Sequence, residues 1–420
     1  MKRILMVSTH GYFEGNPSFG RSDTGGQIVF VIELSKALAK FGYQVDILSR
    51  QFEDFEQIEQ LTGDVRIVRV PCGGSDFIPK EYLVEYLPEL IDGFVKYCRE
   101  NSVKYDFIDS HYWDAGFVGI KLASTFHIPY IFTPHSLGIW KETRMRQSSA
   151  EEGVAINEAE FEKKYSFKRR NETEKLIMEN AARVVATTPE QKKIMSQSYG
   201  IPAEKIAVIT PGFFPDKYRP IDKNSLSATI KEYKLPARFV FAVGRITSYK
   251  GYDLLIKAFK YVVQEVPGVK LVLAIGSHEP GEVKKREELA QLAESIGLAD
   301  DVLFFGHVEE LENFYNAAKL MVMPSTYEPF GMVAIEGMAC GIPAVVTSRG
   351  GLKDFLVDGE DALIVDPLDM QGMSGAIVRL LKDKRLCEDI SRKGYEKAHS
   401  TFTWERIAES TLNLLISAQK

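Results

Sequence analysis

The stretch Lys319-Leu-Met-Val-Met-Pro-Ser-Thr-Tyr-Glu-Pro-Phe-Gly-Met-Val-Ala-Ile-Glu336 predicts a strand, a loop and a helix in immediate succession. Its first residues form a short apolar run ended by Pro324, which is typical of a buried parallel strand. From Gly331 the apolar residues have helical spacing, and the helix is expected to stop at Gly341. Glu328 therefore lies on the loop, and Glu336 lies about one turn into the helix.

Two explanations account for the acids at this helix entrance. Acidic residues complement the positive end of a helix dipole, and one glutamate needs no other reason. Two acids on either side of an anion-attracting helix end, at the carboxyl end of a parallel strand, also mark the place where open α/β sheets bind ligands. The spacing of Glu328 and Glu336 leaves both explanations open.

Apolar runs of this kind alternate with amphipathic helical stretches along the whole chain, which indicates parallel α/β sheets. The strands expected in a first sheet are Ile4–Ser8, Val45–Ser49, Val65–Val70, Phe107–Ser110, Ile128–Thr133 and Arg183–Thr187. Those expected in a second sheet are Phe239–Val243, Lys270–Ile275, Val302–Gly306, Leu320–Pro324, Ala344–Thr347 and Ala362–Val365. Thr210–Pro220, rich in proline, glycine and aromatic residues, separates the two series as a hinge. The sequence thus predicts two doubly wound domains that face one another across a cleft.

Length, charge and cysteine content narrow the class of protein. A chain of 420 residues with 45% hydrophobic residues fits two or three domains. The net charge of −6, with no long basic stripe, argues against nucleic acid as a partner. The short apolar run after Met1 predicts a first strand rather than a signal peptide, and no run reaches membrane-spanning length. The cysteines at 72, 98, 340 and 387 have neither metal-ligand nor disulfide spacing, so a reducing cytoplasm is expected.

Each half of the chain has a glycine turn between a strand and a helix. Asp23-Thr-Gly-Gly-Gln27 opens a helix that runs to about Phe41. Val243–Gly251 contains Arg245 and Lys250 between its glycines. Neither turn is a G-x-G-x-x-G or a P-loop motif, so the main sequence evidence for binding of a nicotinamide cofactor or of Mg-ATP is missing. Charged side chains are usually solvated, but a cation pair at the carboxyl end of a strand favours a diphosphate clamp.

These motifs together resemble the retaining GT-B glycosyltransferases of the sucrose-phosphate synthase type. The resemblance is carried by the Glu328 to Glu336 spacing, Asp23–Gln27, Thr133-Pro-His-Ser-Leu-Gly138 and the Gly244-Arg245 to Lys250-Gly251 loop. A closer likeness to mannosylfructose-phosphate synthases lies in Ser8–Phe13, Pro71–Leu83, Ser110–Gly116 and Pro134–Lys141. The resemblance covers nearly the whole chain. It implies an acceptor-binding Rossmann-like domain, residues 1–212 with a C-terminal helix at 400–420 that crosses back to it, and a nucleotide-sugar-binding Rossmann-like domain, residues 213–399.

The resemblance also implies roles for the two acids. Glu336 would bind the ribose hydroxyls of the donor, and Glu328 would bind its hexose. The other donor-binding residues implied are Gly26, Arg245, Lys250, Phe330, Gly331, Met332 and Val333. The implied transfer is retaining, with acceptor attack on the face from which the diphosphate leaves, and its catalytic residues would be His135, Arg245, Lys250 and Glu328. Two carboxylates could alternatively serve a glycosidase, but a hydrolase has no need of the Arg245 and Lys250 pair.

Acceptor recognition is expected in the first domain. The acceptor-binding residues that the resemblance implies are Gly25, Gln27, Lys80, Tyr112, Lys141, Arg169 and Arg170. The cations would hold a sugar phosphate. Arg169 and Arg170 could instead belong to a salt-bridged helix face, and one of them, with Arg170 preferred, is expected to bind phosphate. His111, Trp113 and Asp114 are further candidates to line the cleft, although Trp113 could equally belong to the core.

The expected activity is hexosyl transfer from GDP-mannose or UDP-glucose to fructose 6-phosphate, which gives a phosphorylated non-reducing disaccharide. Sucrose-phosphate synthesis from UDP-glucose is the alternative within the family, and a non-catalytic nucleotide-sugar sensor is the alternative of another class. The nucleotide sugar is a co-substrate, and no cofactor or metal is expected because the sequence has no evident Asp-x-Asp motif. No oligomeric state follows from the sequence, and neither nucleic acid nor a membrane is expected as a partner.

Overall fold

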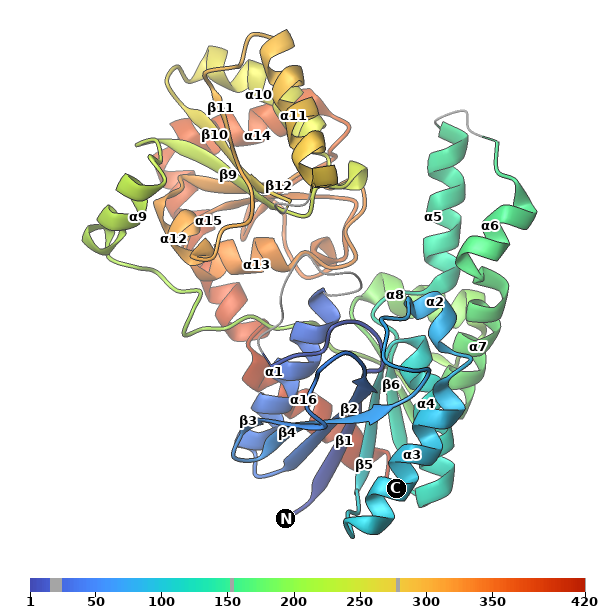
Figure 1. The fold of residues 1–420 in the computed structure, drawn as a ribbon. Coiled ribbons are helices and arrows are strands. Elements are labelled where there is room, and N and C mark those ends of the chain that lie inside the picture. The colour runs from blue at the N-terminus through green and yellow to red at the C-terminus, as the bar shows by residue number, and fades with distance from the viewer. Residues whose placement is uncertain (16–24, 152–154, 277–279, 420) are drawn as a thin grey trace. The chain divides into compact units, whose positions relative to one another are not determined.

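The computed structural model describes residues 1–15, 25–151, 155–276 and 280–419. Asp23 and Thr24 of the first glycine motif lie outside the described residues. The chain divides into two compact units (Figure 1). Unit 1 comprises Met1–Thr210 and Trp404–Lys420, and unit 2 comprises Pro211–Thr403.

Unit 1 contains, over the described residues, an eight-stranded sheet in the order β3-β4-β2-β1-β5-β6-β7-β8. The strands are β1 (Arg3–Val7), β2 (Gln44–Gln51), β3 (Ile58–Thr62), β4 (Val65–Pro71), β5 (Phe107–His111), β6 (Tyr130–Thr133), β7 (Arg183–Ala186) and β8 (Ile206–Val208). Every neighbouring pair is parallel except β3 with β4. The sequence analysis missed β3 and β8. The first is a partly exposed edge strand with polar residues, and the second is only three residues long, so neither forms a long apolar run.

The α-helices of unit 1 connect successive strands, except the C-terminal one. They are α1 (Gly26–Lys40), α2 (Lys80–Leu83), α3 (Leu87–Glu100), α4 (Trp113–Phe126), α5 (Gly138–Glu151), α6 (Glu158–Tyr165), α7 (Phe167–Asn180), α8 (Pro189–Tyr199) and α16 (Trp404–Ser417). The helix α16 packs on α1, and Trp404 meets the Phe30 ring edge-on with 5.2 Å between ring centroids. The C-terminal helix therefore returns to the first unit, as the sequence analysis expected.

Among its described residues, unit 2 contains a six-stranded parallel sheet in the order β11-β10-β9-β12-β13-β14. Its strands are β9 (Phe239–Gly244), β10 (Lys270–Ile275), β11 (Val302–Phe305), β12 (Leu320–Met323), β13 (Ala344–Thr347) and β14 (Leu363–Val365). Its α-helices are α9 (Ser227–Glu232), α10 (Tyr252–Glu265), α11 (Pro280–Ser295), α12 (Leu311–Ala317), α13 (Met332–Ala339), α14 (Met370–Lys382) and α15 (Lys384–Thr401). Figure 1 shows helices on both faces of this sheet.

Both faces of the unit 2 sheet are buried, which explains why its strands read as continuous apolar runs. Phe239 and Phe241 of β9 belong to one apolar cluster, and the alternate residues Val240 and Ala242 belong to another. Alternate residues of a strand point to opposite faces, so the two clusters are the two sides of the sheet. All six strands run in one direction, and the loops at their carboxyl ends therefore gather along one edge.

The chain passes between the units twice, at Thr210–Pro211 and at Thr403–Trp404. Within unit 2 these two crossings are tied together, because the Phe213 N–H donates to the Phe402 carbonyl at 2.8 Å and Phe213 forms a parallel bridge with Thr403. The first crossing falls inside the hinge stretch that the sequence indicated.

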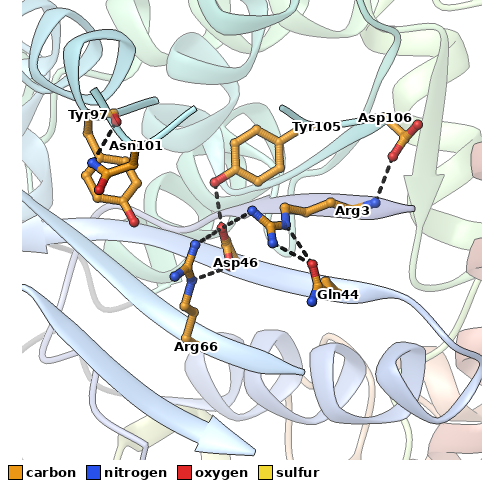
Figure 2. Close-up of polar contacts among 8 residues, drawn as sticks. All are labelled: Arg3, Gln44, Asp46, Arg66, Tyr97, Asn101, Tyr105 and Asp106. Atoms are coloured by element: carbon orange, nitrogen blue, oxygen red, sulfur yellow. Dashed lines mark hydrogen bonds and ion pairs between the residues drawn. The ribbon is translucent and has the colours of Figure 1, made fainter. Parts of the chain in front are cut away.

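A polar network joins the amino-terminal ends of three strands of unit 1 (Figure 2). Asp46 on β2 is buried and accepts hydrogen bonds from Arg66 at 2.7 and 2.9 Å and from the Tyr105 hydroxyl at 2.7 Å. Arg3 on β1 lies 4.0 Å from the same carboxylate, and its backbone N–H donates to Asp106 at 2.8 Å. The network lies at the sheet edge opposite the strands' carboxyl ends, so we assign it to stability.

Candidate active site

The loop between β12 and α13 places Glu328 in unit 2. Gly331 ends this loop with a φ of 121°, and a Cβ there would lie 2.9 Å from the Met323 Cε. Only glycine fits such a position without strain. The loop is fixed further because the Gly351 N–H donates to the Glu328 carbonyl at 3.1 Å. The loop backbone around Glu328 is consequently fixed in place, and the Glu328 carboxylate is buried.

The Glu328 carboxylate is paired with the second predicted cation. The Lys250 Nζ donates to Glu328 Oε2 at 2.6 Å, and the Ser325 hydroxyl donates to the same oxygen at 3.2 Å. Both charged side chains are largely removed from solvent, with the Lys250 side chain 15% exposed and the Glu328 side chain 10% exposed. The structure therefore brings together two residues that the sequence placed in separate motifs.

Two loops must touch for this ion pair to form. Gly251 has a φ of 68°, and a Cβ at this position would lie 2.2 Å from the Pro324 carbonyl oxygen. The Thr326 N–H also donates to the Tyr249 carbonyl at 2.8 Å. The glycine after Lys250 thus serves close backbone approach between the loops after β9 and β12. Arg245, on the first of these loops, is exposed, and its Nη2 lies 3.4 Å from the Tyr249 hydroxyl.

Glu336 lies in α13, and the pKa of its carboxyl is raised. Burial raises the pKa of its carboxyl to about 7, against an opposing effect of a hydrogen bond from Tyr315. The Tyr315 hydroxyl lies 3.2 Å from Glu336 Oε2 and 2.9 Å from the Val333 carbonyl. Because an isolated glutamate has a pKa near 4.3, this carboxyl exchanges its proton close to neutral pH.

The residues around Gly331 contribute backbone rather than side chains. Phe330 is buried and packs edge-on against Phe355 and Phe402, each with 5.9 Å between ring centroids. Met332 and Val333 pack against the same apolar cluster. Their side chains are therefore part of the core of unit 2, and only their backbone groups at the start of α13 are suited to meet a ligand.

The beginning of α1 in unit 1 carries the first glycine motif. Gly25 precedes the helix and Gly26 is its first residue. A Cβ at either glycine would meet no described atom within 4 Å, so packing within the described residues does not require glycine there. The next side chain, Gln27, donates to the Ser8 hydroxyl and to the His111 carbonyl, both at 3.1 Å.

His135 follows β6 and touches a second histidine. It has a left-handed φ of 55°, and its Nε2 lies 3.0 Å from the His111 Nδ1. Burial, followed by the neighbouring His111 and His10, holds the pKa of His135 well below its usual range. The ring is therefore neutral near pH 7. The Phe30 ring packs edge-on against it with 4.8 Å between centroids.

A pocket in unit 1 contains three of the cations that were predicted to bind a phosphate. Its lining residues are Lys80, Glu81, Tyr112, Trp113, Lys141, Tyr165, Phe167 and Arg170. Trp113, at 3% exposure, both lines this pocket and belongs to the core. Glu81, Tyr165 and Phe167 were not expected. Aromatic residues at helical spacing carry no signal that separates a pocket wall from a core, and a single acid such as Glu81 is usually a solvated surface residue.

The structure separates the two neighbouring arginines. Arg170 is buried, and its guanidinium donates to Glu174 at 2.7 Å and to the Ser136 carbonyl at 2.8 Å while lying over the Tyr112 ring. Arg169 is 53% exposed, lies 3.8 Å from Glu85 and does not line the pocket. The geometry favours Arg170 as the pocket arginine.

Glu174 fixes this arginine from a fully buried position. Its carboxylate also accepts hydrogen bonds from the Gly138 N–H at 2.8 Å and from the Tyr199 hydroxyl. A buried carboxylate with several donors is rigidly placed, so it orients the Arg170 guanidinium.

Asp114 and His10 form a carboxylate–histidine pair next to the candidate site. The sequence analysis did not identify them as a pair. The His10 Nδ1 lies 2.9 Å from Asp114 Oδ2, and the Thr9 hydroxyl donates to the same oxygen at 2.7 Å. Asp114 is fully buried, and the pKa of its carboxyl is lowered because His10 and Thr9 outweigh the cost of burial. Asp114, one of the expected cleft liners, therefore supports His10.

The described residues contain neither a candidate metal centre nor a membrane-spanning helix. Within the ranges that the structure describes, no group of three or more His, Cys, Asp or Glu side chains is arranged to hold a metal ion. No described helix is both long and apolar enough to cross a membrane.

Two units built on largely parallel sheets, with a cation-containing loop after β9 and two spaced glutamates on the loop and helix after β12, define a GT-B glycosyltransferase. Residues 229–397 match the family described as glycosyl transferases group 1, and residues 24–217 match glycosyltransferase family 4. The chain is 40% identical to mannosylfructose-phosphate synthase of Agrobacterium fabrum over 98% of this chain and 91% of that protein. The chain belongs to this family of glycosyltransferases, and it is an enzyme rather than a sensor or a hydrolase.

Other relatives support the same placement. D-inositol 3-phosphate glycosyltransferase of Corynebacterium urealyticum is 28% identical over 98% of this chain and 95% of its own length. The solved structure of sucrose-phosphate synthase from Thermosynechococcus elongatus superposes with a TM-score of 0.81 and 29% identity, covering 99% of both chains. All three names contain a phosphorylated polyol or sugar.

Proposed function

We propose that the protein transfers a hexosyl group from a nucleotide sugar, GDP-mannose or UDP-glucose, to fructose 6-phosphate with retention of configuration. The product is a phosphorylated non-reducing disaccharide. The observation that carries this proposal is the unit 1 pocket that gathers Lys80, Lys141 and Arg170 in a chain of net charge −6. The 40% identity to mannosylfructose-phosphate synthase supports the acceptor and favours a mannosyl donor.

Unit 1 binds the acceptor in this proposal. Lys80, Lys141 and Arg170 hold the phosphate, because a dianion in a partly buried cationic pocket interacts far more strongly than in water. Gly25, Gln27 and Tyr112 contact the acceptor hydroxyls. No described atom lies within 4 Å of a Cβ placed at Gly25 or Gly26, which supports this role, since glycine lets a ligand approach the backbone closely. Arg170, rather than the exposed Arg169, is the arginine that binds phosphate.

Unit 2 binds the donor. Glu336 accepts hydrogen bonds from the ribose hydroxyls and Glu328 from the hexose hydroxyls, while backbone groups from Phe330 to Val333 face the sugar and diphosphate. Arg245 and Lys250 bind the diphosphate. The contact between Lys250 and Glu328 supports this arrangement, because one residue of the pair suits a diphosphate and the other suits a hexose.

The chemical step needs no protein nucleophile. The acceptor hydroxyl attacks the anomeric carbon on the face from which the diphosphate departs, and the enzyme stabilises the negative charge that develops on the leaving group. Arg245, Lys250 and the Gly26 N–H supply that stabilisation, while His135 contacts the donor sugar near the anomeric carbon. These donors substitute for a metal ion, so activity is expected to survive EDTA; complete loss that Mg²⁺ restores would refute metal-independent transfer.

The experiment that tests the function is a matrix of donors and acceptors. GDP-mannose, UDP-glucose and ADP-glucose are each assayed with fructose 6-phosphate and with free fructose. We expect fructose 6-phosphate to be used far better than fructose, with GDP-mannose as the preferred donor. Preference for UDP-glucose would instead establish sucrose-phosphate synthesis, and equal use of both acceptors would refute the phosphate pocket.

Lys80→Ala sharpens the same test. Loss of one cation from a desolvated phosphate site costs about 2 to 5 kcal/mol, so acceptor kcat/KM should fall by about 30-fold or more while donor KM stays unchanged. Lys96→Ala on α3 is the matched control, because Lys96 is 73% exposed.

The four unpaired cysteines support a reducing cytoplasm as the location of this enzyme.

A further inference from the structure

Three side chains of unit 1 form a line that ends at His135. Asp109 Oδ1 lies 3.4 Å from His111 Nε2, and His111 Nδ1 lies 3.0 Å from His135 Nε2. Asp109 and His111 are buried at 1% and 0% exposure, whereas His135 is only partly buried. The line therefore runs from the interior of the sheet to an accessible histidine.

The fold fixes the members of this line. Asp109 and His111 alternate along β5, so their side chains share one face of the sheet. His111 is paired in register with Thr133 at the end of β6, two residues before His135. The Phe30 ring packs against both histidines, at 5.7 Å and 4.8 Å between centroids. The strand pairing and this aromatic contact bring the rings together.

The facing atoms determine which nitrogens carry protons. Asp109 Oδ1 and His111 Nε2 are both buried and have no hydrogen-bond partner within normal geometry among the described atoms, apart from facing each other. A carboxylate only accepts, so the proton of a neutral His111 belongs on Nε2. The His111 Nδ1 then has a lone pair and must accept from the Nε2–H of His135. The remaining nitrogen of His135, Nδ1, is left unprotonated.

We propose that Asp109 and His111 are positioning residues that fix His135 in the tautomer with a bare Nδ1, which accepts a hydrogen bond from a sugar hydroxyl of the substrate. The inference rests on the proposed function only for the identity of that ligand. A bare imidazole nitrogen suits a hydroxyl and not a diphosphate, because the phosphate oxygens also only accept. The depressed pKa of His135 agrees with a neutral ring.

The tautomer can be read in the ligand-free protein by long-range ¹H–¹⁵N correlation after ¹⁵N-histidine labelling. The chain has 7 histidines, and His135→Gln assigns the signal of interest. We expect His135 Nδ1 to show the shift of an unprotonated nitrogen and Nε2 that of a protonated one. A protonated Nδ1 on His135, which a charged His111 would cause, would overturn the proposal whether or not the protein shows activity.

Paired substitutions separate positioning from simple packing. Asp109→Leu removes the acceptor for His111, whereas Asp109→Asn can still offer its carbonyl oxygen. We expect Asp109→Leu to change the His135 shifts and to lower kcat by about 10- to 100-fold with the KM for fructose 6-phosphate unchanged. Asp109→Asn should keep the wild-type tautomer and most of kcat. A folded Asp109→Leu with wild-type shifts and kcat would refute the role, as would altered shifts with an unchanged kcat.

A second pair of variants tests the proposal in case Asp109→Leu does not fold. His111→Asn keeps an acceptor close to the position of Nδ1, and His111→Leu does not, so kcat should be at least about tenfold higher in the former. Equal kcat in two folded variants would contradict the proposal. His127→Asn is the control because His127 is exposed and asparagine tolerates its left-handed φ of 55°. It should remove one histidine signal and leave kcat unchanged.

Discussion

Donor binding should depend on pH through Glu336. The pKa of its carboxyl is raised to about 7 by burial, so in the free protein the group is about one-tenth ionised at pH 6 and about nine-tenths ionised at pH 8. The carboxylate offers one accepting oxygen to each ribose hydroxyl, whereas the protonated acid uses one of its two oxygens as a donor and accepts more weakly. The affinity for the donor is therefore present in full above pH 7 and decreases as the pH falls through 7, by about tenfold between pH 8 and pH 6.

Isothermal titration calorimetry with an intact nucleotide sugar measures this effect directly. The diphosphate of a nucleotide sugar is esterified at both ends, so it does not titrate near neutral pH, unlike a free nucleoside diphosphate. Repetition in buffers of different ionisation enthalpy counts the protons released on binding. We expect about 0.9 proton per donor at pH 6 and about 0.1 at pH 8, because the bound state contains the carboxylate.

Glu336→Gln should remove the pH dependence. A hydrogen bond to a charged group contributes about 1.5 to 3 kcal/mol, so the variant should bind about 10- to 100-fold more weakly at pH 8 and differ less at pH 6. Glu265→Gln, at an exposed carboxyl on α10, should behave as the wild type. An affinity that is constant from pH 6 to pH 8, with no proton released, would show that Glu336 does not bind the ribose as a carboxylate.

Three further predictions follow from the charged contacts. Arg245→Ala and Lys250→Met should each lower kcat by about 10²- to 10³-fold at saturating donor, because each removes a donor to the leaving diphosphate; Lys257→Met, at a partly exposed lysine on α10, is the control, and near wild-type turnover of Arg245→Ala or Lys250→Met would refute the clamp. Arg170→Met should impair acceptor kcat/KM and also lower the melting temperature, since it strands the fully buried Glu174, whereas Lys80→Ala should affect only kcat/KM; an unchanged melting temperature for Arg170→Met would contradict the burial argument. Asp46→Ala should lower the free energy of unfolding by about 1 to 3 kcal/mol in urea titrations without changing kcat, with exposed Asp92→Ala as the control, and a loss of kcat would show that the network of Figure 2 reaches the active site.

The sequence was sufficient for the fold where both faces of a strand are covered. The strands predicted from apolar runs lie within a residue or two of those observed, because burial on both sides forces a continuous apolar run. The edge strand Ile58–Thr62 is partly exposed and carries polar residues, so hydrophobic patterning has nothing to detect there. The three-residue strand Ile206–Val208 is too short for any pattern.

Candidate site residues could be proposed from the sequence where a motif contains them, but the residues that they contact could not. Arg169 and Arg170 are adjacent in sequence, and only the packing of α7 shows that Arg170 shares a buried face with Glu174. Glu174, four residues after Arg170, suggested an ordinary surface ion pair in the sequence. In the structure it is the group that orients Arg170 in the pocket. The contact between His111 and His135 likewise depends on the pairing of β5 with β6, which no local pattern encodes.

The discontinuity of unit 1 sets an order of events during biosynthesis. Its α16 is translated only after the whole of unit 2, yet Trp404 of that helix packs on Phe30, and Phe30 packs on His135. Unit 2 is contiguous and can fold as soon as it leaves the ribosome. Unit 1 lacks α16, which packs on α1, until the end of the chain has been translated. A nascent chain therefore has an exposed apolar face beside His135, and the aromatic contact of Trp404 that supports this region forms only once translation has passed through both units.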